Sequence, residues 1–194
     1  MFGGRVLRGP RRRLRCPVSS QAGLSLVPTQ PQPAVDPWRL LLEYRIPGVP
    51  QAKQRARAGI RGKRAHLYQD SKHPSEAYAV LVSTYVRIRM RARGVEKIPK
   101  DTPVRVDIDF VYPRRRSQFR AKDPDTRIHK ATKPDRDNLE KLQLDAMTDA
   151  ELWADDGVVC AGAVRKWWGA IVDRKGKRSE APHALVRVFL LGAP

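Results

Sequence analysis

The sequence predicts an α/β (α+β) domain in which a mixed β-sheet carries its helices mainly on one side. Residues 104–112 alternate apolar and polar side chains, as a strand with one buried face does. Residues 74–94 and 138–150 instead repeat apolar side chains at helical spacing, with further strand-like runs before and after them. This mixed order of strands and helices is what predicts the sheet and its covering layer.

The N-terminal half of the domain is expected to contain a strand, a hairpin and a helix. Residues 40–46 have a strand pattern that two prolines and a glycine stop at 47–50, and the basic segment 53–68 resembles a hairpin. Pro74 suits the first position of a helix that Gly94 closes. Tyr78 and Tyr85 could stack on bases, but their spacing favours the core. The predicted core stripe is Tyr78, Leu81, Val82, Tyr85 and Ile88.

The C-terminal half is expected to begin with the strand 104–112. Because Arg105, Asp107 and Asp109 occupy alternate positions, we expect the second face of the sheet to be wet. Residues 113–133 form a long basic loop, which at that length is functional or disordered. A second helix over 138–150 buries Leu139, Leu142 and Ala146, and strands follow at 158–164 and 184–191 around a charged loop, 173–180.

The charge of the chain indicates a polyanionic partner. The 194 residues include 39 Lys and Arg against 20 Asp and Glu, a formal net charge of +19. Nucleic acid is the commonest such partner, and a generally basic surface or anionic lipid is the alternative. The candidate DNA-binding residues in the basic clusters are Lys53, Arg55, Arg57, Arg114, Arg115 and Arg116.

Several classes of protein are excluded or disfavoured. Cys16 and Cys160 form no CxxC pair and the four histidines lack ligand spacing, so a disulfide scaffold or zinc knuckle is not expected. No apolar run approaches the length of about 20 residues that spans a membrane. We therefore expect a cytoplasmic protein with no membrane partner.

Residues 1–37 are expected to be a disordered basic, proline-rich leader before a domain at 38–194. A transit peptide, a DNA-grasping tail and a misassigned start codon would each explain this leader.

Carboxylates gather in one part of this cationic chain. Asp135 and Asp137 lie two residues apart at the expected helix start, Lys141 follows one turn later, and Asp155 and Asp156 lie where the chain leaves the helix. A strand end, a helix N-terminus and a returning loop could converge on one ion, and hard oxygen ligands suit Mg²⁺.

Each acidic pair also has a purely structural interpretation. Asp137 with Glu140 matches a capping box, and Asp155-Asp156-Gly157 matches a turn. Taken together within a strongly basic chain, the acids favour a metal site.

The same residues resemble a known family. The run Pro134-Asp-Arg-Asp-Asn-Leu-Glu-Lys141, followed by Leu144-Asp-Ala146 and by Trp153-Ala-Asp-Asp156 with Val158-Val159, is similar to the signature of RusA-type Holliday-junction resolvases. The resemblance covers roughly residues 40–191, including the basic segment KQRAR at 53–57. The leader and the insert at 113–133 lie outside the pattern of the shortest members.

The resemblance implies roles for particular residues. Asp135 and Asp137 fall on the family's paired metal-binding aspartates, Asp156 on the third, and Asp155 could assist or orient it. Lys141 falls on the catalytic lysine. Lys166 lies near a recurring basic position and joins the DNA-binding candidates.

The expected activity follows from the resemblance and from the chemistry of these residues. We expect a Mg²⁺-dependent endonuclease, with Mn²⁺ as a possible substitute, that resolves four-way DNA by paired symmetric nicks as a homodimer. It would act in recombination, repair or phage DNA processing, in the cytoplasm of a bacterial or phage-infected cell. The alternative is a non-catalytic, structure-selective DNA-binding protein. A nuclease of the PD-(D/E)xK kind is disfavoured because no suitable (D/E)-x-K follows Asp135 at the usual distance.

Overall fold

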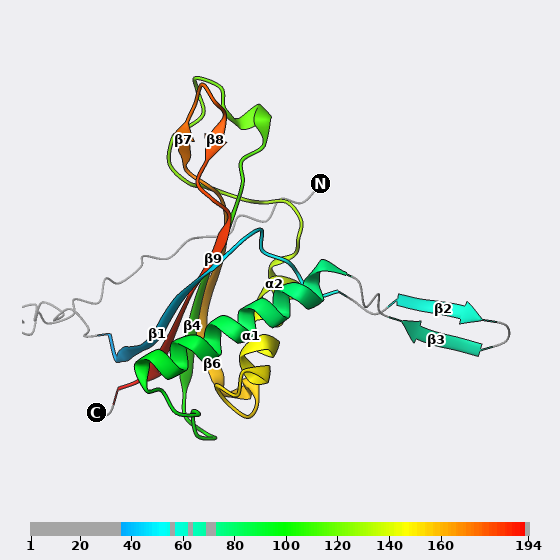
Figure 1. Ribbon diagram of the computed structural model, residues 1–194, viewed down its shortest axis with the longest axis vertical. Helices are drawn as coiled ribbons and strands as arrows, with labels where there is room; N and C mark the ends of the chain where they lie inside the picture. Colours follow the sequence, from blue (N-terminus) through cyan, green and yellow to red (C-terminus); the bar gives the residue numbers. More distant parts are fainter. Residues whose placement is uncertain (1–35, 55–56, 62–63, 69–72, 193–194) are drawn as a thin grey trace, which may run out of the picture. The chain divides into compact units, whose positions relative to one another are not determined.

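The computed structural model describes residues 36–54, 57–61, 64–68 and 73–192 (Figure 1). The expected leader therefore lies outside the described residues, except for Asp36 and Pro37. The helices are α1 (Pro74–Arg93) and α2 (Arg136–Asp149), with 3₁₀ turns η1 (Arg116–Gln118) and η2 (Asp156–Val158). The strands are β1 (Trp38–Pro47), β2 (Arg57–Arg61), β3 (Arg64–Tyr68), β4 (Val104–Tyr112), β5 (Ile128–His129), β6 (Val159–Trp168), β7 (Ile171–Asp173), β8 (Arg178–Ser179) and β9 (His183–Leu191).

The main sheet is mixed, as predicted. Its five strands run in the order β1-β9-β4-β6-β5. The parallel pair is β4 and β6, whereas β9 is antiparallel to both β1 and β4 and β5 is antiparallel to β6. The predicted basic hairpin is formed by β2 and β3, and a second small hairpin, β7 with β8, begins two residues before the expected charged loop and overlaps it.

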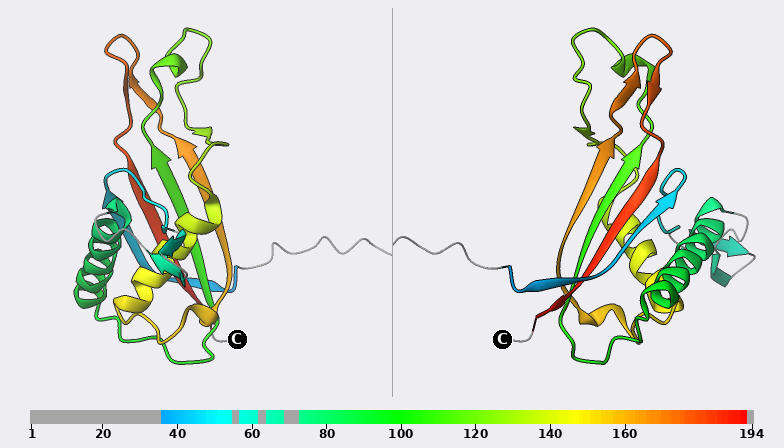
Figure 2. Two further views of the ribbon diagram at one scale, coloured as in Figure 1. Left: turned by 90° about the vertical axis from the view of Figure 1, so that its right-hand side faces the viewer. Right: turned by 60° about the vertical axis from the view of Figure 1, so that its left-hand side comes forward.

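Both helices pack on one face of this sheet, and the hydrophobic core lies between the two layers (Figure 2). Alternate residues of three strands point into that core because strand side chains alternate between faces. They are Leu42, Tyr44 and Ile46 of β1, Val104, Val106, Ile108 and Phe110 of β4, and Ala184, Val186 and Val188 of β9. The predicted fold class is therefore confirmed.

Helix α1 begins and ends where the sequence predicts. Pro74 is its first residue, and Gly94 ends it with φ of 60°, a left-handed conformation that glycine adopts without strain. Tyr78 is buried, and burial raises the pKa of its hydroxyl, so the core interpretation of Tyr78 is confirmed. The end of the predicted stripe is wrong, because Ile88 is 56% exposed and Val86 is buried instead.

The second face of β4 is not wet, contrary to expectation. Asp107 and Asp109 are only 7% and 8% exposed. Arg105 pairs with Asp107 at 2.8 Å, and the backbone N–H of Ala163 donates to the same carboxylate at 2.9 Å. The indole of Trp167 donates to Asp109 at 2.8 Å. Neighbouring strands thus cover these acids with their own donors, which an alternating pattern within one strand does not reveal.

Replacing Asp107 with Ala should destabilise the domain. The change would leave the Ala163 N–H without its acceptor and Arg105 with only the exposed carboxylate of Asp36 as counter-charge, so we expect a loss of about 2–4 kcal/mol in unfolding free energy. Chemical denaturation measures it, with Glu96→Ala at an exposed position as the control. Equal denaturation midpoints for the two variants would contradict a stabilising role for Asp107.

The remaining predicted elements are confirmed with shifted bounds. Helix α2 begins at Arg136, two residues before the expected start, and β6 runs to Trp168, four residues beyond the expected end. The long loop 113–133 contains η1 and β5, and Arg127 ties it to Glu180 at 2.8 Å. That guanidinium lowers the pKa of Glu180. Among the described residues, the structure contains no helix with the length and apolar character needed to cross a bilayer.

Candidate active site

The start of α2 carries the first two predicted site residues. Asp135 is the N-cap residue, in an extended conformation with φ of −71° and ψ of 145°, and its side chain makes no capping hydrogen bond. Asp137 lies in the first turn and is exposed, as Asp135 is. The capping box expected for Asp137 and Glu140 is therefore wrong, since the helix begins one residue before Asp137. The N-terminal end of a helix also favours bound anions.

Two lysines hold the backbone that leads into Asp135. The ammonium of Lys166, on β6, donates to the carbonyl oxygens of Thr132 at 3.0 Å and Pro134 at 2.8 Å. The ammonium of Lys130 donates to the Thr132 carbonyl at 2.9 Å and to the carbonyl of Lys133. Two ammonium groups thus fix residues 132–134, which directly precede Asp135 in the chain.

Lys130 is a candidate site residue that the sequence pattern did not single out. It is only 5% exposed, and its ammonium lies 4.7 Å from the ring centre of Tyr112 and 4.9 Å from that of Trp168. Burial, together with the nearby charges of Lys166 and Arg115, lowers its pKa to about 8. In the sequence Lys130 is one more cation in a basic loop, and its aromatic partners come from the ends of β4 and β6.

Because the pKa of Lys130 is lowered, we expect the stability of the folded domain to depend on pH. Between about 8 and the ordinary value of 10.5 the unfolded chain holds this proton and the folded chain does not, so unfolding free energy rises with pH. Lys130→Met removes this contribution, and subtracting its stability curve cancels the other titrating groups. Wild type should gain stability relative to Lys130→Met from pH 8 to pH 10, measured by urea denaturation. A constant difference would contradict the shifted pKa.

The other predicted acids lie where the chain leaves α2. Asp155 accepts a hydrogen bond from the backbone N–H of Gly157 at 2.7 Å and caps η2. Asp156 is exposed in the first turn of η2, directly before β6 begins at Val159. The turn predicted for these residues is confirmed, and it accounts for Asp155 more than for Asp156.

The two groups of acids lie at opposite ends of α2 within one chain. The 14 residues of α2 span about 21 Å at 1.5 Å per residue. Strand β6 gives the same separation, since Lys166 near its C-terminal end contacts Pro134 whereas Asp156 adjoins its N-terminal end. In the described part of the chain no three Asp, Glu, His or Cys side chains form a metal-binding group. The convergence of helix start and exit loop on one ion is therefore wrong for a single chain, because the exit loop joins the far end of β6.

The remaining basic candidates differ in what their side chains contact. Lys141 is exposed on α2, one turn after Asp137. Lys53 is tied to the same helix, since its ammonium pairs with Asp145 and its backbone N–H donates to the Asn138 carbonyl at 2.9 Å. The candidate cations therefore come from four separate segments of the chain, which contain Lys53, Lys130, Lys141 and Lys166.

Arg114 requires a correction as a DNA-binding candidate. It is 7% exposed, and its guanidinium donates to the carbonyl of Gly169 at 2.7 Å and to that of Thr126. It anchors the loop after β4 and cannot reach a phosphate without leaving those carbonyls. Arg116 is exposed, and Arg115 lies 5.2 Å from the centre of the Trp168 ring. Arg55 and the side chain of Arg57 lie outside the described residues.

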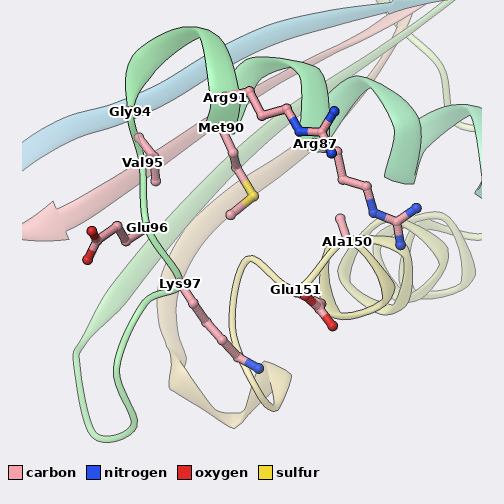
Figure 3. Close-up of a pocket in the computed structure, with 9 residues that line it drawn as sticks. All are labelled: Arg87, Met90, Arg91, Gly94, Val95, Glu96, Lys97, Ala150 and Glu151. Atoms are coloured by element: carbon pink, nitrogen blue, oxygen red, sulfur yellow. The ribbon is translucent and has the colours of Figure 1, made fainter.

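A second surface with basic side chains lies at the C-terminal ends of α1 and α2, at the end of α2 opposite Asp135. A hollow of about 540 Å³ lies at the C-terminal ends of α1 and α2 (Figure 3). Arg87, Arg91 and Lys97 line it together with Glu96 and Glu151, and Arg87 donates to the Asp149 carbonyl at 2.5 Å. This hollow is on the Asp156 side of α2, so it is separate from the Asp135 site.

A comparison with known protein families identifies the family to which the chain belongs. The sequence model of the family described as Endodeoxyribonuclease RusA matches residues 47–174. The chain belongs to the RusA family. The match runs from the end of β1 to the turn after β7 and includes all the predicted site residues from Lys53 to Lys166. No curated protein matches the chain.

The RusA family is one of crossover junction endodeoxyribonucleases, so the predicted enzyme class is confirmed. The donor set at the start of α2 fits the metal that such hydrolysis uses. Asp135 and Asp137 offer hard carboxylate oxygens on an exposed helix end, and Mg²⁺ is commonly bound by one or two carboxylates together with water and phosphate.

Proposed function

We propose that this RusA-family protein is a Mg²⁺-dependent endonuclease that resolves four-way DNA junctions by paired symmetric nicks. The observation that carries the proposal is the start of α2, where Asp135 and Asp137 follow a backbone segment whose carbonyls, at Lys133 and Pro134, bind the ammonium groups of Lys130 and Lys166. Acids alone would repel a DNA backbone. Acids held next to fixed cations at a helix N-terminus can bind a metal and a phosphate together.

Each residue of the proposed site has a chemical role. Asp135, Asp137 and Asp156 would hold the ion, with Asp155 orienting Asp156. Bound Mg²⁺ supplies a more acidic water and stabilises charge on the phosphate. Lys141, one turn along α2, would stabilise negative charge on the phosphate or the leaving oxygen. The backbone contacts of Lys130 and Lys166 would keep Asp135 in position during the reaction.

A homodimer accounts for both the paired nicks and the divided acids. A two-fold axis would set two identical sites on the two opposing strands of a junction. Since Asp156 lies at the far end of α2 from Asp135, the third carboxylate of each site would come from the second copy. One chain would then contribute Asp135 and Asp137 to one site and Asp156 to the other.

Junction recognition would rest on shape and backbone charge. Phosphate contacts fix a protein on DNA without reading bases, and a four-way junction differs from a duplex in the path of its backbone. Lys53, Arg115, Arg116 and the basic hairpin would supply these contacts, with Arg55 and Arg57 in that hairpin segment. Binding should therefore weaken steeply as salt rises. The expected setting is the cytoplasm of a bacterial or phage-infected cell.

The proposal is tested with a synthetic four-way junction and a linear duplex of the same sequence. With Mg²⁺ or Mn²⁺, we expect two symmetric nicks in the junction and none in the duplex, and with EDTA we expect none in either. Tight junction binding without cleavage in either metal would favour the non-catalytic DNA-binding alternative. Equal cleavage of the duplex would contradict junction selectivity.

A further inference from the structure

Two segments that leave the main sheet at the same end are tied to one another. The first is 113–127, the larger part of the long basic loop after β4, and the second is 169–180, which contains β7 and β8. We call the two segments together the braced arm. It projects beyond the end of the sheet at which β4 and β6 finish (Figure 1, Figure 2).

Hydrogen bonds between the two segments hold the braced arm together. The guanidinium of Arg174 donates to the carbonyl of Asp123 at 2.8 Å, and the backbone N–H of Ile171 donates to the carbonyl of Asp125 at 2.7 Å. The other ties are Arg114 to Gly169 and Ser179, Arg127 to Glu180, and Arg174 to Arg120 and Asp125. Because these bonds connect the segments along their length, the arm is one fixed unit and not two independent loops.

The acids of the braced arm are engaged within it, whereas most of its outward cations are not. The arm contains ten Lys and Arg against four Asp and Glu. Two acids pair with arginines of the arm at 2.5 Å and two accept backbone N–H groups of their own turns: Asp125, Glu180, Asp123 and Asp173, respectively. Within the described ranges, no carboxylate pairs with the exposed side chains of Arg116, Arg120, Lys122, Lys175, Lys177 and Arg178.

The base of the braced arm adjoins the segment that leads into α2. Arg115 lies 5.2 Å from the centre of the Trp168 ring, and the ammonium of Lys130 lies 4.9 Å from the centre of the same ring. After burial and the charge of Lys166, the charge of Arg115 also lowers the pKa of Lys130. Since Lys130 in turn bonds to the carbonyl of Lys133, positive charge continues from the segment before α2 into the arm.

We propose that the braced arm binds the phosphate backbone of the duplex that leads away from the cleavage site. A duplex carries one negative charge about every 1.7 Å along its axis, so it matches a row of cations better than a compact anion does. Cations on a fixed support bind with a smaller ordering cost than cations on free loops. Contacts of this kind position DNA without reading its sequence.

The proposal deepens the proposed function and rests on it for the kind of DNA that is bound. The ties within the arm and its outward cations stand without that function. The arm would add a contact outside the site itself. Seven residues separate Trp168, at the end of β6, from Lys175, so the arm reaches at most roughly 25 Å, or about seven base pairs, along the duplex.

Salt-dependent binding tests the contact. The arm variant Lys122→Gln, Lys175→Gln, Arg178→Gln removes three exposed cations that make no tie within the arm. For a synthetic four-way junction in EDTA at about 0.1 M salt, we expect binding to weaken by about tenfold or more. The slope of log affinity against log salt should become shallower by about two to three, because each lost phosphate contact lowers it by about 0.9.

The matched control removes three exposed cations at the other end of the domain. Arg89→Gln, Arg93→Gln, Lys100→Gln makes the same change in net charge on and after α1. Its affinity should stay within a factor of about two of wild type, and its salt slope should not change. Equal losses in the two triple variants would show that net charge acts and the arm does not, and this would overturn the proposal.

Photo-cross-linking locates the contact without removing a cation. In a Cys16→Ser, Cys160→Ser chain, a photoreactive group is attached to Ala121→Cys, an exposed position in the arm, or to Ala92→Cys, an exposed position on α1. The group at position 121 should cross-link the junction within about ten base pairs of the cleavage site, and the group at position 92 should not. Cross-linking from position 92 alone would overturn the proposal.

Cleavage separates failure of the arm contact from failure of the proposed function. A chain that cross-links through position 121 and loses affinity in the arm variant, but never nicks a junction with Mg²⁺, would refute the function and keep the contact. A chain that nicks junctions while its arm variant binds them as wild type does would refute the contact and keep the function.

Discussion

Junctions incubated with the Asp137→Asn variant should remain uncut while still binding the protein. Asn keeps the size of the side chain but removes the charge and one anionic oxygen that the proposed metal site needs. We expect nicking to fall on the order of 10⁴-fold, as when one member of a catalytic unit is lost. Binding should stay equal or become tighter, because the variant removes a negative charge that repels phosphate. Single-turnover cleavage and gel-shift titrations measure the two effects.

Asp149→Asn is the matched control for this experiment. It makes the same change at an exposed position of the same helix, but at the end opposite Asp137 and outside the proposed site. Its cleavage rate should be within a factor of about two of wild type, as surface substitutions usually are mild. An Asp137→Asn protein that cuts as fast as Asp149→Asn would remove Asp137 from the site.

Mixing two inactive variants should restore cleavage. If each site takes Asp137 from one chain and Asp156 from the other, a dimer of Asp137→Asn with Asp156→Asn has one site with both defects and one intact site. Random association makes half of the dimers mixed, and each keeps one of its two sites, so about a quarter of all sites should be active. Nicking of one strand per junction by the mixed, co-refolded protein is the expected readout.

The control mixture combines Asp135→Asn with Asp137→Asn. Both changes lie at the start of α2, so every site in the mixed dimer keeps one defect and no activity should return. Recovery in this mixture would show that Asp135 and Asp137 of one chain do not serve the same site. No recovery in the Asp137 and Asp156 mixture would instead mean that these two carboxylates do not serve one site across two chains.

Local patterns were enough to predict the main elements of the fold. The spacing of Tyr78 and Val82, with Pro74 and Gly94 at the ends, specifies α1 within the residues themselves. The solvent exposure of β4 depends instead on other strands. Asp107 and Asp109 are buried because Arg105, Trp167 and the Ala163 N–H supply donors, and only the sheet order brings the last two together with them. The sequence therefore predicted strand β4 correctly but predicted the solvent exposure of its second face wrongly.

The candidate site also contains residues whose positions could be predicted from the sequence and residues whose positions could not. Asp135 and Asp137 are adjacent in sequence, so their joint position at a helix start could be predicted. The distance to Asp156 depends on which end of β6 the exit loop joins, which spacing does not encode. Lys130 and Arg114 were misjudged because their burial depends on carbonyls and rings supplied by remote segments.

The contacts of Lys53 connect the segment before the β2–β3 hairpin to the first and third turns of α2. Its backbone N–H donates to the carbonyl of Asn138, the residue after Asp137. Its ammonium pairs with Asp145, two turns further along α2. A force applied to the hairpin by a bent nucleic acid would therefore be transmitted to the helix that carries Asp137. The shape of the bound DNA would thereby change the position of the Asp137 carboxylate. A correctly shaped substrate would then help to align the catalytic group that acts on it.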